Sequence, residues 1–473
     1  MDKLNWMKKA CALLLLCATT GVALPAQTFT TLHSFDNSDG SYLLAGLVQG
    51  TDGNFYGTTT GGGIYGDGTV FSITAGGTLT TLHSFDGTDG SIPTAGLIQG
   101  TDGKLYGTTS SGGAGNVGTI FSITESGTLT TLHSFDDTDG SGVFGGLVQA
   151  TNGKFYGTTY AGGTNDRGTV FSITPSGTLT TLHNFHGPDG RYSQAGLVQG
   201  IDGKFYGTTS GGGANDTCEY GCGTVFSISA SGTLATLHSF GADGYYPQAA
   251  LVQDTDGTFY GTTPAGGDNY CGGGCGTVFR ITPGGTLTTL HSFEDTDGAY
   301  PMAGLVRGID GKFYGTTLGG GDYCASGGCG TAFNITSGGE LTTLHKFYGP
   351  DGERPAGGIA QGTDGTFYGT TFEGGANSCP AGNCGTVFNL SVGLGPFVET
   401  LPTSGAVGVA VTILGTGLTG STKVTFHGIA ATFTVVSASE ITTSVPTGAT
   451  TGTVKVITPG GTLSSNQAFT VLP

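Results

Sequence analysis

The sequence has little charge, almost no tryptophan and no helical pattern. Only 10% of its 473 residues are charged, and Trp6 is the single tryptophan. No stretch beyond the first 26 residues shows the 3.6-residue apolar period of an amphipathic helix. Lys and Arg number 15 against 33 Asp and Glu, so the net charge of −18 would repel nucleic acid and anionic membrane surfaces. These absences favour an all-β protein with no nucleic-acid partner.

Long apolar runs are also scarce. The run from Ala10 to Ala18 follows Lys8 and Lys9, and it is shorter than the ~20 residues that a membrane span needs. A basic start, a short apolar centre and small residues up to Ala26 are the layout of a secretory signal peptide. We therefore expect residues 1–26 to be a signal peptide, the mature chain to lack a transmembrane span, and the protein to be secreted or held at the cell surface.

What the chain has instead is repetition. The phrase Phe-Tyr-Gly-Thr-Thr, with Leu in one copy, begins at Phe55, Leu105, Phe155, Phe205, Phe259, Phe313 and Phe367. The phrase Thr-Leu-His-(Ser/Asn/Lys)-Phe places its histidine at His33, His83, His133, His183, His238, His291 and His345. Successive histidines are 50 to 55 residues apart. A period of this length indicates a propeller, a solenoid or an array.

Each repeat divides into four strand-like segments separated by turn signals. In the fourth repeat these are Gly196–Gln199, Phe205–Thr209, Thr224–Ser229 and Thr233–Phe240. Four antiparallel strands in about 50 residues are typical of a propeller blade. The chain opens on Thr28–Phe35, a fourth strand without a first three, and its last repeat stops after three strands. We predict a seven-bladed β-propeller over residues 28–392 that is closed by both ends of the chain, with an open superhelical stack as the alternative.

Cysteines are missing from the first three repeats, but the later four repeats each contain a close pair. The pairs are Cys218/Cys222, Cys271/Cys275, Cys324/Cys329 and Cys379/Cys384. We expect local disulfides formed in an oxidising compartment, each adding roughly 2 kcal/mol of stability. A zinc site would require two pairs on different repeats to converge on one ion, and we expect no metal and no cofactor.

The repeats, with their Thr-Leu-His-Ser-Phe, Thr-Asp-Gly-Lys-Phe-Tyr-Gly-Thr-Thr and Gly-Thr-Val-Phe-Ser-Ile-Thr phrases, resemble the GloVer-type tandem repeats of secreted bacterial β-propellers. This resemblance implies export and a propeller, without an activity. Residues 396–473 differ: Leu401-Pro-Thr-Ser-Gly405 and Gly415-Thr-Gly417 among short alternating strands resemble the IPT/TIG domain. That resemblance implies a small immunoglobulin-like β-sandwich of the stalk or adhesion kind, since only Lys423 and Lys455 could contact DNA.

The recurring polar residues are expected to be structural. We expect the recurring histidine of each repeat to make the same local contact, a hydrogen bond between strands. We expect His186 and His427 to be solvated. A first set of Asp-Gly pairs occupies the first hairpin turn. A second set comprises Asp39, Asp89, Asp139, Asp189, Asp243, Asp297 and Asp351. Turns are favoured here too, with calcium as an alternative near Asp36/Asp39, Asp136/Asp139 and Glu294/Asp297.

Two sets of loops vary between repeats: the link from each fourth strand to the next first strand, and the loop between the second and third strands. Strand alternation places both sets on one face, and loops on a rigid scaffold are where binding is usually built. The candidate binding residues are Tyr65, Tyr160, Tyr192, Tyr220, Tyr245, Tyr246, Tyr270, Tyr300, Tyr323, Arg354 and Glu373.

Tyrosine beside amides and carboxylates suits sugar rings. We expect a non-catalytic binding or adhesion protein, for extracellular glycan or a cell-surface protein. The alternatives are a polysaccharide hydrolase or lyase that uses acids on this face, such as Asp216 with Glu219, Asp268, Asp322 or Glu373, and a structural scaffold for protein partners. No catalytic residue stands out.

Overall fold

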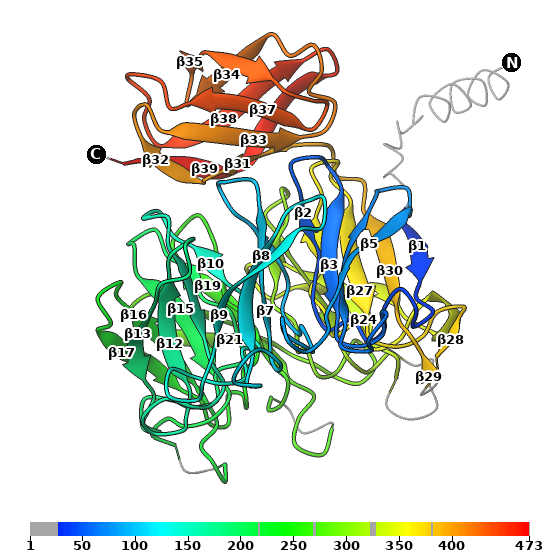
Figure 1. Cartoon of the computed structure of the whole chain (residues 1–473), viewed down its shortest axis with the longest axis vertical. Coiled ribbons are helices and arrows are strands. Elements are labelled where there is room, and N and C mark those ends of the chain that lie inside the picture. Colours follow the sequence, from blue (N-terminus) through cyan, green and yellow to red (C-terminus); the bar gives the residue numbers. More distant parts are fainter. Residues whose placement is uncertain (1–26, 216–217, 268–270, 322–327, 380–381, 473) are drawn as a thin grey trace, which may run out of the picture.

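The computed structural model describes residues 27–215, 218–267, 271–321, 328–379 and 382–472, and Figure 1 shows a ring of sheets below a smaller β-domain. The 3-10 turn η1 (Gly349–Asp351) is the one helical element among these residues. None of their helices is long and apolar enough for a membrane crossing. The expected signal peptide, residues 1–26, lies outside the described residues. The all-β prediction is confirmed.

The ring consists of seven four-stranded antiparallel sheets, which we call blades 1 to 7. Each blade starts with a two-residue strand. Blades 1 to 3 contain β2 (Val48–Gln49), β3 (Phe55–Thr59), β4 (Thr69–Ile73), β5 (Leu79–Ser84), β6 (Ile98–Gln99), β7 (Leu105–Thr109), β8 (Thr119–Ile123), β9 (Leu129–Ser134), β10 (Val148–Gln149), β11 (Phe155–Thr158), β12 (Thr169–Ile173) and β13 (Leu179–Asn184). Blades 4 to 6 contain β14 (Val198–Gln199), β15 (Phe205–Thr209), β16 (Thr224–Ile228), β17 (Leu234–Ser239), β18 (Val252–Gln253), β19 (Phe259–Thr263), β20 (Thr277–Ile281), β21 (Leu287–Ser292), β22 (Val306–Arg307), β23 (Phe313–Thr317), β24 (Thr331–Ile335) and β25 (Leu341–Lys346).

Blade 7 is built from both ends of the propeller sequence. Its strand order is β26 (Ala360–Gln361), β27 (Phe367–Thr371), β30 (Thr386–Ser391) and then β1 (Thr28–Ser34). The register pairs Thr28 with Ser391 and Ser34 with Thr386. A small hairpin, β28 (Ser378–Cys379) and β29 (Gly382–Asn383), projects between β27 and β30. The predicted seven-bladed ring is therefore confirmed, and β1 supplies the strand that pairs with the outer side of β30.

Aromatic residues of the second strands hold neighbouring blades together. Tyr156 stacks on Phe205 of the next blade with ring centroids 4.0 Å apart, and the same pairing recurs in most junctions. Between blades 1 and 2, Leu105 replaces the phenylalanine against Tyr56. These rings are almost completely buried. Burial of this size is what stabilises the ring, because each blade alone is too thin to have a core.

The centre of the ring is packed too closely for larger side chains. The backbones of Gly46, Gly358 and Gly304 follow one another around the axis, and a Cβ on Gly46 would lie 2.7 Å from the Gly358 carbonyl oxygen. Thr370 Oγ1 donates to the Ala45 carbonyl oxygen across the closure, at 2.8 Å. This close approach explains why the first strand of each repeat is preceded by Gly or Ala.

The C-terminal domain is a β-sandwich with its own core. It contains β31 (Val398–Leu401), β32 (Ser404–Ala406), β33 (Ala410–Gly415), β34 (Lys423–Phe426), β35 (Ile429–Ala431), β36 (Phe433–Val435), β37 (Glu440–Ser444), β38 (Gly452–Thr458) and β39 (Gly461–Leu472). Strand β39 pairs with both β38 and β31 and so joins the two layers. Phe426, Ile441, Val456 and Phe469 are buried between them. The predicted immunoglobulin-like domain is confirmed.

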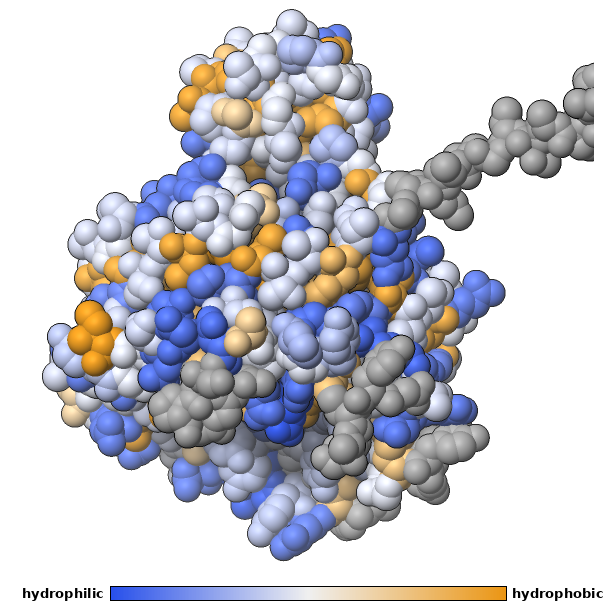
Figure 2. Space-filling view, turned by 90° about the vertical axis from the view of Figure 1, so that its right-hand side faces the viewer, coloured by the Kyte–Doolittle hydropathy of each residue, from blue (hydrophilic) through white to orange (hydrophobic). Residues whose placement is uncertain are grey.

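The two ends of the propeller differ. The short hairpin turns form one end, which we call the turn face, and the variable loops form the other, the loop face. The C-terminal domain stands on the turn face as a separate lobe (Figures 1 and 2). Ser439 Oγ donates to the Thr51 carbonyl oxygen, at 2.8 Å, and Thr363 and Thr416 share a hydroxyl hydrogen bond of the same length. The loop face is therefore left uncovered by the C-terminal domain.

Candidate functional site

The two variable loop sets meet at the loop face in every blade. Each link between blades forms an isolated antiparallel bridge with the loop that follows the second strand, as Arg191 does with Gly211 and Glu353 does with Glu373. Of the eleven candidate binding residues, Tyr270 and Tyr323 lie outside the described residues. The other nine are all in these links and loops. The scaffold thus brings the variable positions to one end of the molecule.

One position that is equivalent in all seven links has a left-handed backbone. The positions are Tyr42, Ile92, Gly142, Tyr192, Tyr246, Tyr300 and Arg354, and the six non-glycine members have φ between 55° and 61°. We call them the link residues. A bulky residue in this region costs about 1–2 kcal/mol.

Hydrogen bonds from two blades hold six of the seven link residues in place, and Tyr246 has the first bond alone because Pro264 has no N–H. The Ile92 N–H donates to the Asp67 carbonyl oxygen of the preceding blade, at 2.9 Å, and the Ser110 N–H donates to the Ile92 carbonyl oxygen, at 3.1 Å. The side chains of Ile92, Tyr246 and Tyr300 remain 39–42% exposed. The fold therefore imposes a strained conformation that keeps large side chains at the surface.

Five side chains from blades 3 and 4 form a continuous group that we call the aromatic cluster: Phe144, Tyr160, Arg191, Tyr192 and Tyr220. Phe144 meets Tyr160 edge to face at 5.3 Å, and Tyr160 stacks on Tyr192 at 4.9 Å. The Arg191 guanidinium lies over two rings, 5.5 Å from the centroid of Tyr192 and 5.0 Å from that of Tyr220. The cluster places aromatic rings and a forked hydrogen-bond donor side by side.

Tyr220 is fixed in the cluster from two sides. Arg191 Nε donates to the Tyr220 carbonyl oxygen, at 2.8 Å. The Cys218–Cys222 disulfide closes the loop around it, while the Tyr220 side chain is 55% exposed. A second loop is closed by Cys271–Cys275. Cys329 and Cys384 are also disulfide-bonded, and the expected partners Cys324 and Cys379 have no described side chains.

The remaining candidates do not join the cluster. Arg354 Nη1 and Glu373 Oε1 form an ion pair at 3.3 Å in blade 7. Tyr245 and Tyr246 are neighbours in sequence with centroids 6.1 Å apart. Tyr65, in blade 1, is 63% exposed. Sequence reasoning placed these residues on one face, but it could not show that, of the candidates that the structure describes, Tyr160, Tyr192 and Tyr220 would form the cluster.

Two members of the cluster, Phe144 and Arg191, were not among the candidate binding residues. Both stand in links that the sequence marks as variable. Their position in the sequence could have marked them as candidates. Arg191 directly precedes a link residue, and Phe144 lies two residues after Gly142, which is the link residue of its own link. The asparagines of the loops have a different role. The amide of Asn215 donates to the Phe240 carbonyl oxygen, at 2.8 Å, and so braces its own blade.

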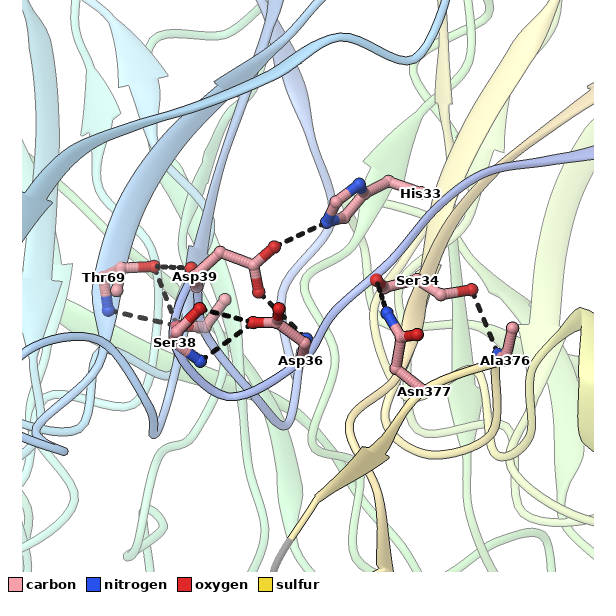
Figure 3. A network of polar contacts seen from close by, with 9 residues as sticks. His33, Ser34, Asp36, Ser38, Asp39, Thr69, Ala376 and Asn377 are labelled. Carbon is pink, nitrogen blue, oxygen red and sulfur yellow. Dashed lines mark hydrogen bonds and ion pairs between the residues drawn. The ribbon is translucent and has the colours of Figure 1, made fainter.

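The recurring histidine has a partner that sequence reasoning missed. His33 Nε2 and Asp39 Oδ2 lie 2.7 Å apart, and all seven repeats show this pair at 2.6–2.9 Å. The expected hydrogen bond between strands is therefore a bond to the following link. Figure 3 shows this network where β1 closes the ring, with Asn377 donating to the Ser34 carbonyl oxygen at 2.7 Å. The pair fixes the path of each link.

The acidic residues considered for calcium have internal partners. Asp39 accepts the Asp36 N–H on Oδ1 and contacts His33 through Oδ2, and Asp36 accepts both the N–H and the hydroxyl of Ser38. Hydrogen bonds of this kind, the largest from the Ser38 hydroxyl, lower the pKa of Asp36. This geometry favours turns over calcium.

Blade 4 departs from the others at this point. His186, expected to be solvated, has a side chain that is 59% exposed, and it also directs Nδ1 to Asp189 Oδ2, at 2.6 Å. Among the residues that the structure describes, His183, His186 and Asp189 are the one group of three or more His, Cys, Asp or Glu side chains that could share a metal ion.

On the turn face, the first set of aspartates supports buried tyrosines. Tyr206 donates its hydroxyl to Asp202 Oδ2, at 2.9 Å, and Asp202 Oδ1 accepts the Lys204 N–H. Burial, followed by the Asp202 carboxylate, raises the pKa of Tyr206 to about 12. These aspartates stabilise the turns and the tyrosines between blades.

Comparisons with known proteins agree with this architecture. The family model of the Gloeobacter/Verrucomicrobia repeat matches residues 21–219, 193–388 and 272–432, and the IPT/TIG domain model matches residues 397–471. A search of curated proteins found no match.

Two solved structures share the fold. One is a fungal alcohol oxidase of the AA5 family in complex with copper, 14% identical with a TM-score of 0.54, covering 94% of this chain and 99% of that one. The other is the extracellular domain of a hybrid two-component system from B. thetaiotaomicron, 12% identical with a TM-score of 0.50, covering 94% of this chain and 58% of that one. At such identities the likeness shows the fold alone.

Proposed function

Because the chain belongs to the Gloeobacter/Verrucomicrobia repeat family and ends in an IPT/TIG domain, we propose that it is an exported, non-catalytic binding protein whose loop face holds extracellular carbohydrate. The aromatic cluster is the observation that carries this proposal. Three tyrosines, a phenylalanine and an arginine converge there from links and loops that vary between otherwise uniform repeats.

The chemistry of the cluster fits a sugar. A pyranose has an apolar face that stacks on tyrosine and a rim of hydroxyls that accept hydrogen bonds from a guanidinium. Arg191 is already held over two rings. The disulfide beside Tyr220 fixes its loop before binding. A pre-organised surface loses less conformational entropy when a ligand is bound.

The placement of the C-terminal domain supports the same proposal. It covers part of the turn face and leaves the loop face open (Figure 1). In this arrangement the IPT/TIG domain serves as a stalk or a contact to another protein while the propeller binds. The disulfides support export, since such bonds persist in oxidising compartments.

The enzyme alternative has less support from the described residues. Glu373 is paired with Arg354 at 3.3 Å, which leaves its carboxylate poorly placed for acid or base catalysis. Of the other acids considered, Glu219 is exposed beside Tyr220, and Asp216, Asp268 and Asp322 lie outside the described residues. No observation favours a hydrolase or lyase over a binding surface.

The test is retention on a glycan array of the protein from residue 27 onward, with released sugars assayed in parallel. We expect saturable retention of at least one glycan without hydrolysis. The Tyr220→Ala variant should lose tenfold or more of the affinity, because a central stacked tyrosine is a typical binding hot spot.

Tyr65→Ala is the matched control, since Tyr65 is an exposed tyrosine in the equivalent loop of blade 1. It should bind like the unmodified protein. Equal losses from both variants would contradict a site at the cluster, and no retention on any glycan would favour the protein-scaffold alternative.

A further inference from the structure

The end of β13 and the link that follows it, between blades 3 and 4, bring three metal-binding side chains to one place. His183 Nε2 and His186 Nδ1 each lie 2.6 Å from Asp189 Oδ2. All three donor atoms are within 4.8 Å of one another. The Asp189 side chain is 10% exposed, whereas that of His186 is 59% exposed, so an ion could reach the group from solvent.

The surroundings orient these ligands. The His186 N–H donates to Asp189 Oδ1, at 2.9 Å, which turns Oδ2 toward the two imidazoles. The His183 ring packs edge to face on Phe185 at 5.4 Å. Arg167 Nη1 donates to the His186 carbonyl oxygen, at 2.5 Å, and fixes the peptide that carries the second imidazole. Outer contacts of this kind hold ligands in position before the metal binds.

Comparison with the other blades shows that this group is a departure and not part of the repeat. Every blade has the His–Asp pair, but the residue three before the aspartate is Asp36, Asp86 or Asp136 in the first three links. Asp36 directs its carboxylate to Ser38 instead of to the pair. Among the described residues, only the link that has a histidine at this position, His186, places a third metal-binding side chain beside its His–Asp pair.

We infer that His183, His186 and Asp189 bind one divalent transition metal ion, with Zn²⁺ as the best match to two imidazole nitrogens and one carboxylate. Zinc ligands at about 2.0–2.2 Å in a tetrahedral arrangement lie roughly 3.3 Å from one another, so the imidazoles need only small movements to admit the ion. A fourth position is left for water or a ligand. The ion would connect the end of β13 to the link between blades 3 and 4, which continues into Tyr192 of the aromatic cluster.

The experiment is isothermal titration of zinc chloride into metal-stripped protein from residue 27 onward, without a histidine tag. We expect one equivalent to bind saturably and to raise the melting temperature, because an ion that binds only the folded state stabilises it. The His186→Asp variant restores the residue of the first three links. It should fold normally, keep the His183–Asp189 pair and bind zinc at least about tenfold more weakly.

A second variant tests the geometry by gain of function. Asp136→His places a histidine in the same position of the preceding link, beside His133 and Asp139. Zinc binding should rise from one equivalent to two. Absence of saturable zinc binding by the unmodified protein, or unchanged affinity in His186→Asp, would overturn the inference. If His186→Asp were unfolded, a stoichiometry that stays at one in Asp136→His would overturn it.

Discussion

The strained link residues predict an inversion of the usual preference for alanine over glycine. At Ile92, with φ of 55°, alanine keeps the left-handed penalty of about 1–2 kcal/mol, whereas glycine removes it. Glycine pays about 0.5–1 kcal/mol for its greater freedom in the unfolded chain. Both variants lose the same part-exposed side chain. Ile92→Gly should therefore be more stable than Ile92→Ala by about 0.5–1 kcal/mol.

Two control sites in the same propeller test the sign of this difference in stability between the glycine and alanine variants. At Thr80, an exposed position of β5, glycine should be less stable than alanine by about 0.5–1 kcal/mol, because no strain is relieved there. At Gly142, with φ of 65°, alanine should cost about 1 kcal/mol or more. Midpoints of urea unfolding measure all three differences. The same order of alanine and glycine at Ile92 and Thr80 would refute the reasoning.

Three other perturbations follow from the packing. Phe205→Leu recreates the natural contact of Leu105 and should cost about 1–2 kcal/mol in urea unfolding through loss of the Tyr156 stack; no change would mean that the stacking adds nothing beyond burial. Replacing Cys218 and Cys222 by serine should lower stability by about 2 kcal/mol and weaken glycan retention by freeing the Tyr220 loop; unchanged retention would show that pre-organisation is unimportant. Glu399 is half-buried in β31, and burial raises its pKa from 4.5 to about 7 against an opposing hydrogen bond from Asn466. Between pH 4.5 and 7 the folded domain keeps a proton on Glu399 that the unfolded chain releases. The free energy of unfolding is therefore highest below pH 4.5, and it falls by at most about 3 kcal/mol as the pH rises through 7. Glu399→Gln should remove this loss in melting curves between pH 4.5 and 8, and an unaltered pH profile would contradict it.

Much of the fold could be predicted because the repeats give both period and phase. The opening strand Thr28–Phe35 has no first three strands before it, and the structure pairs it with β30. Alternation of strands also places the two variable loop sets at one end. These inferences use only the order of segments along the chain.

The contacts at the loop face could not be predicted in the same way. The partner of His33 is Asp39, in a link whose path depends on left-handed backbone at Tyr42 and on the close approach of neighbouring blades. The approach of Tyr160 to Tyr192 and of Arg191 to Tyr220 depends on the curvature of the ring. Segment order does not contain that information, so sequence reasoning found the face but not the cluster.

The sequence has no tryptophan after Trp6, so the proposed site can be tested directly. Since Trp6 belongs to the expected signal peptide, a Tyr220→Trp variant of the protein from residue 27 onward carries one indole, at the aromatic cluster, and a Tyr65→Trp variant carries one in blade 1. Both would be titrated with the oligosaccharide that the array retains, while indole emission is recorded. We predict a saturable blue shift for the Tyr220→Trp variant and none for the Tyr65→Trp variant. Bound oligosaccharide without a change in emission at position 220 would contradict a carbohydrate site at the cluster.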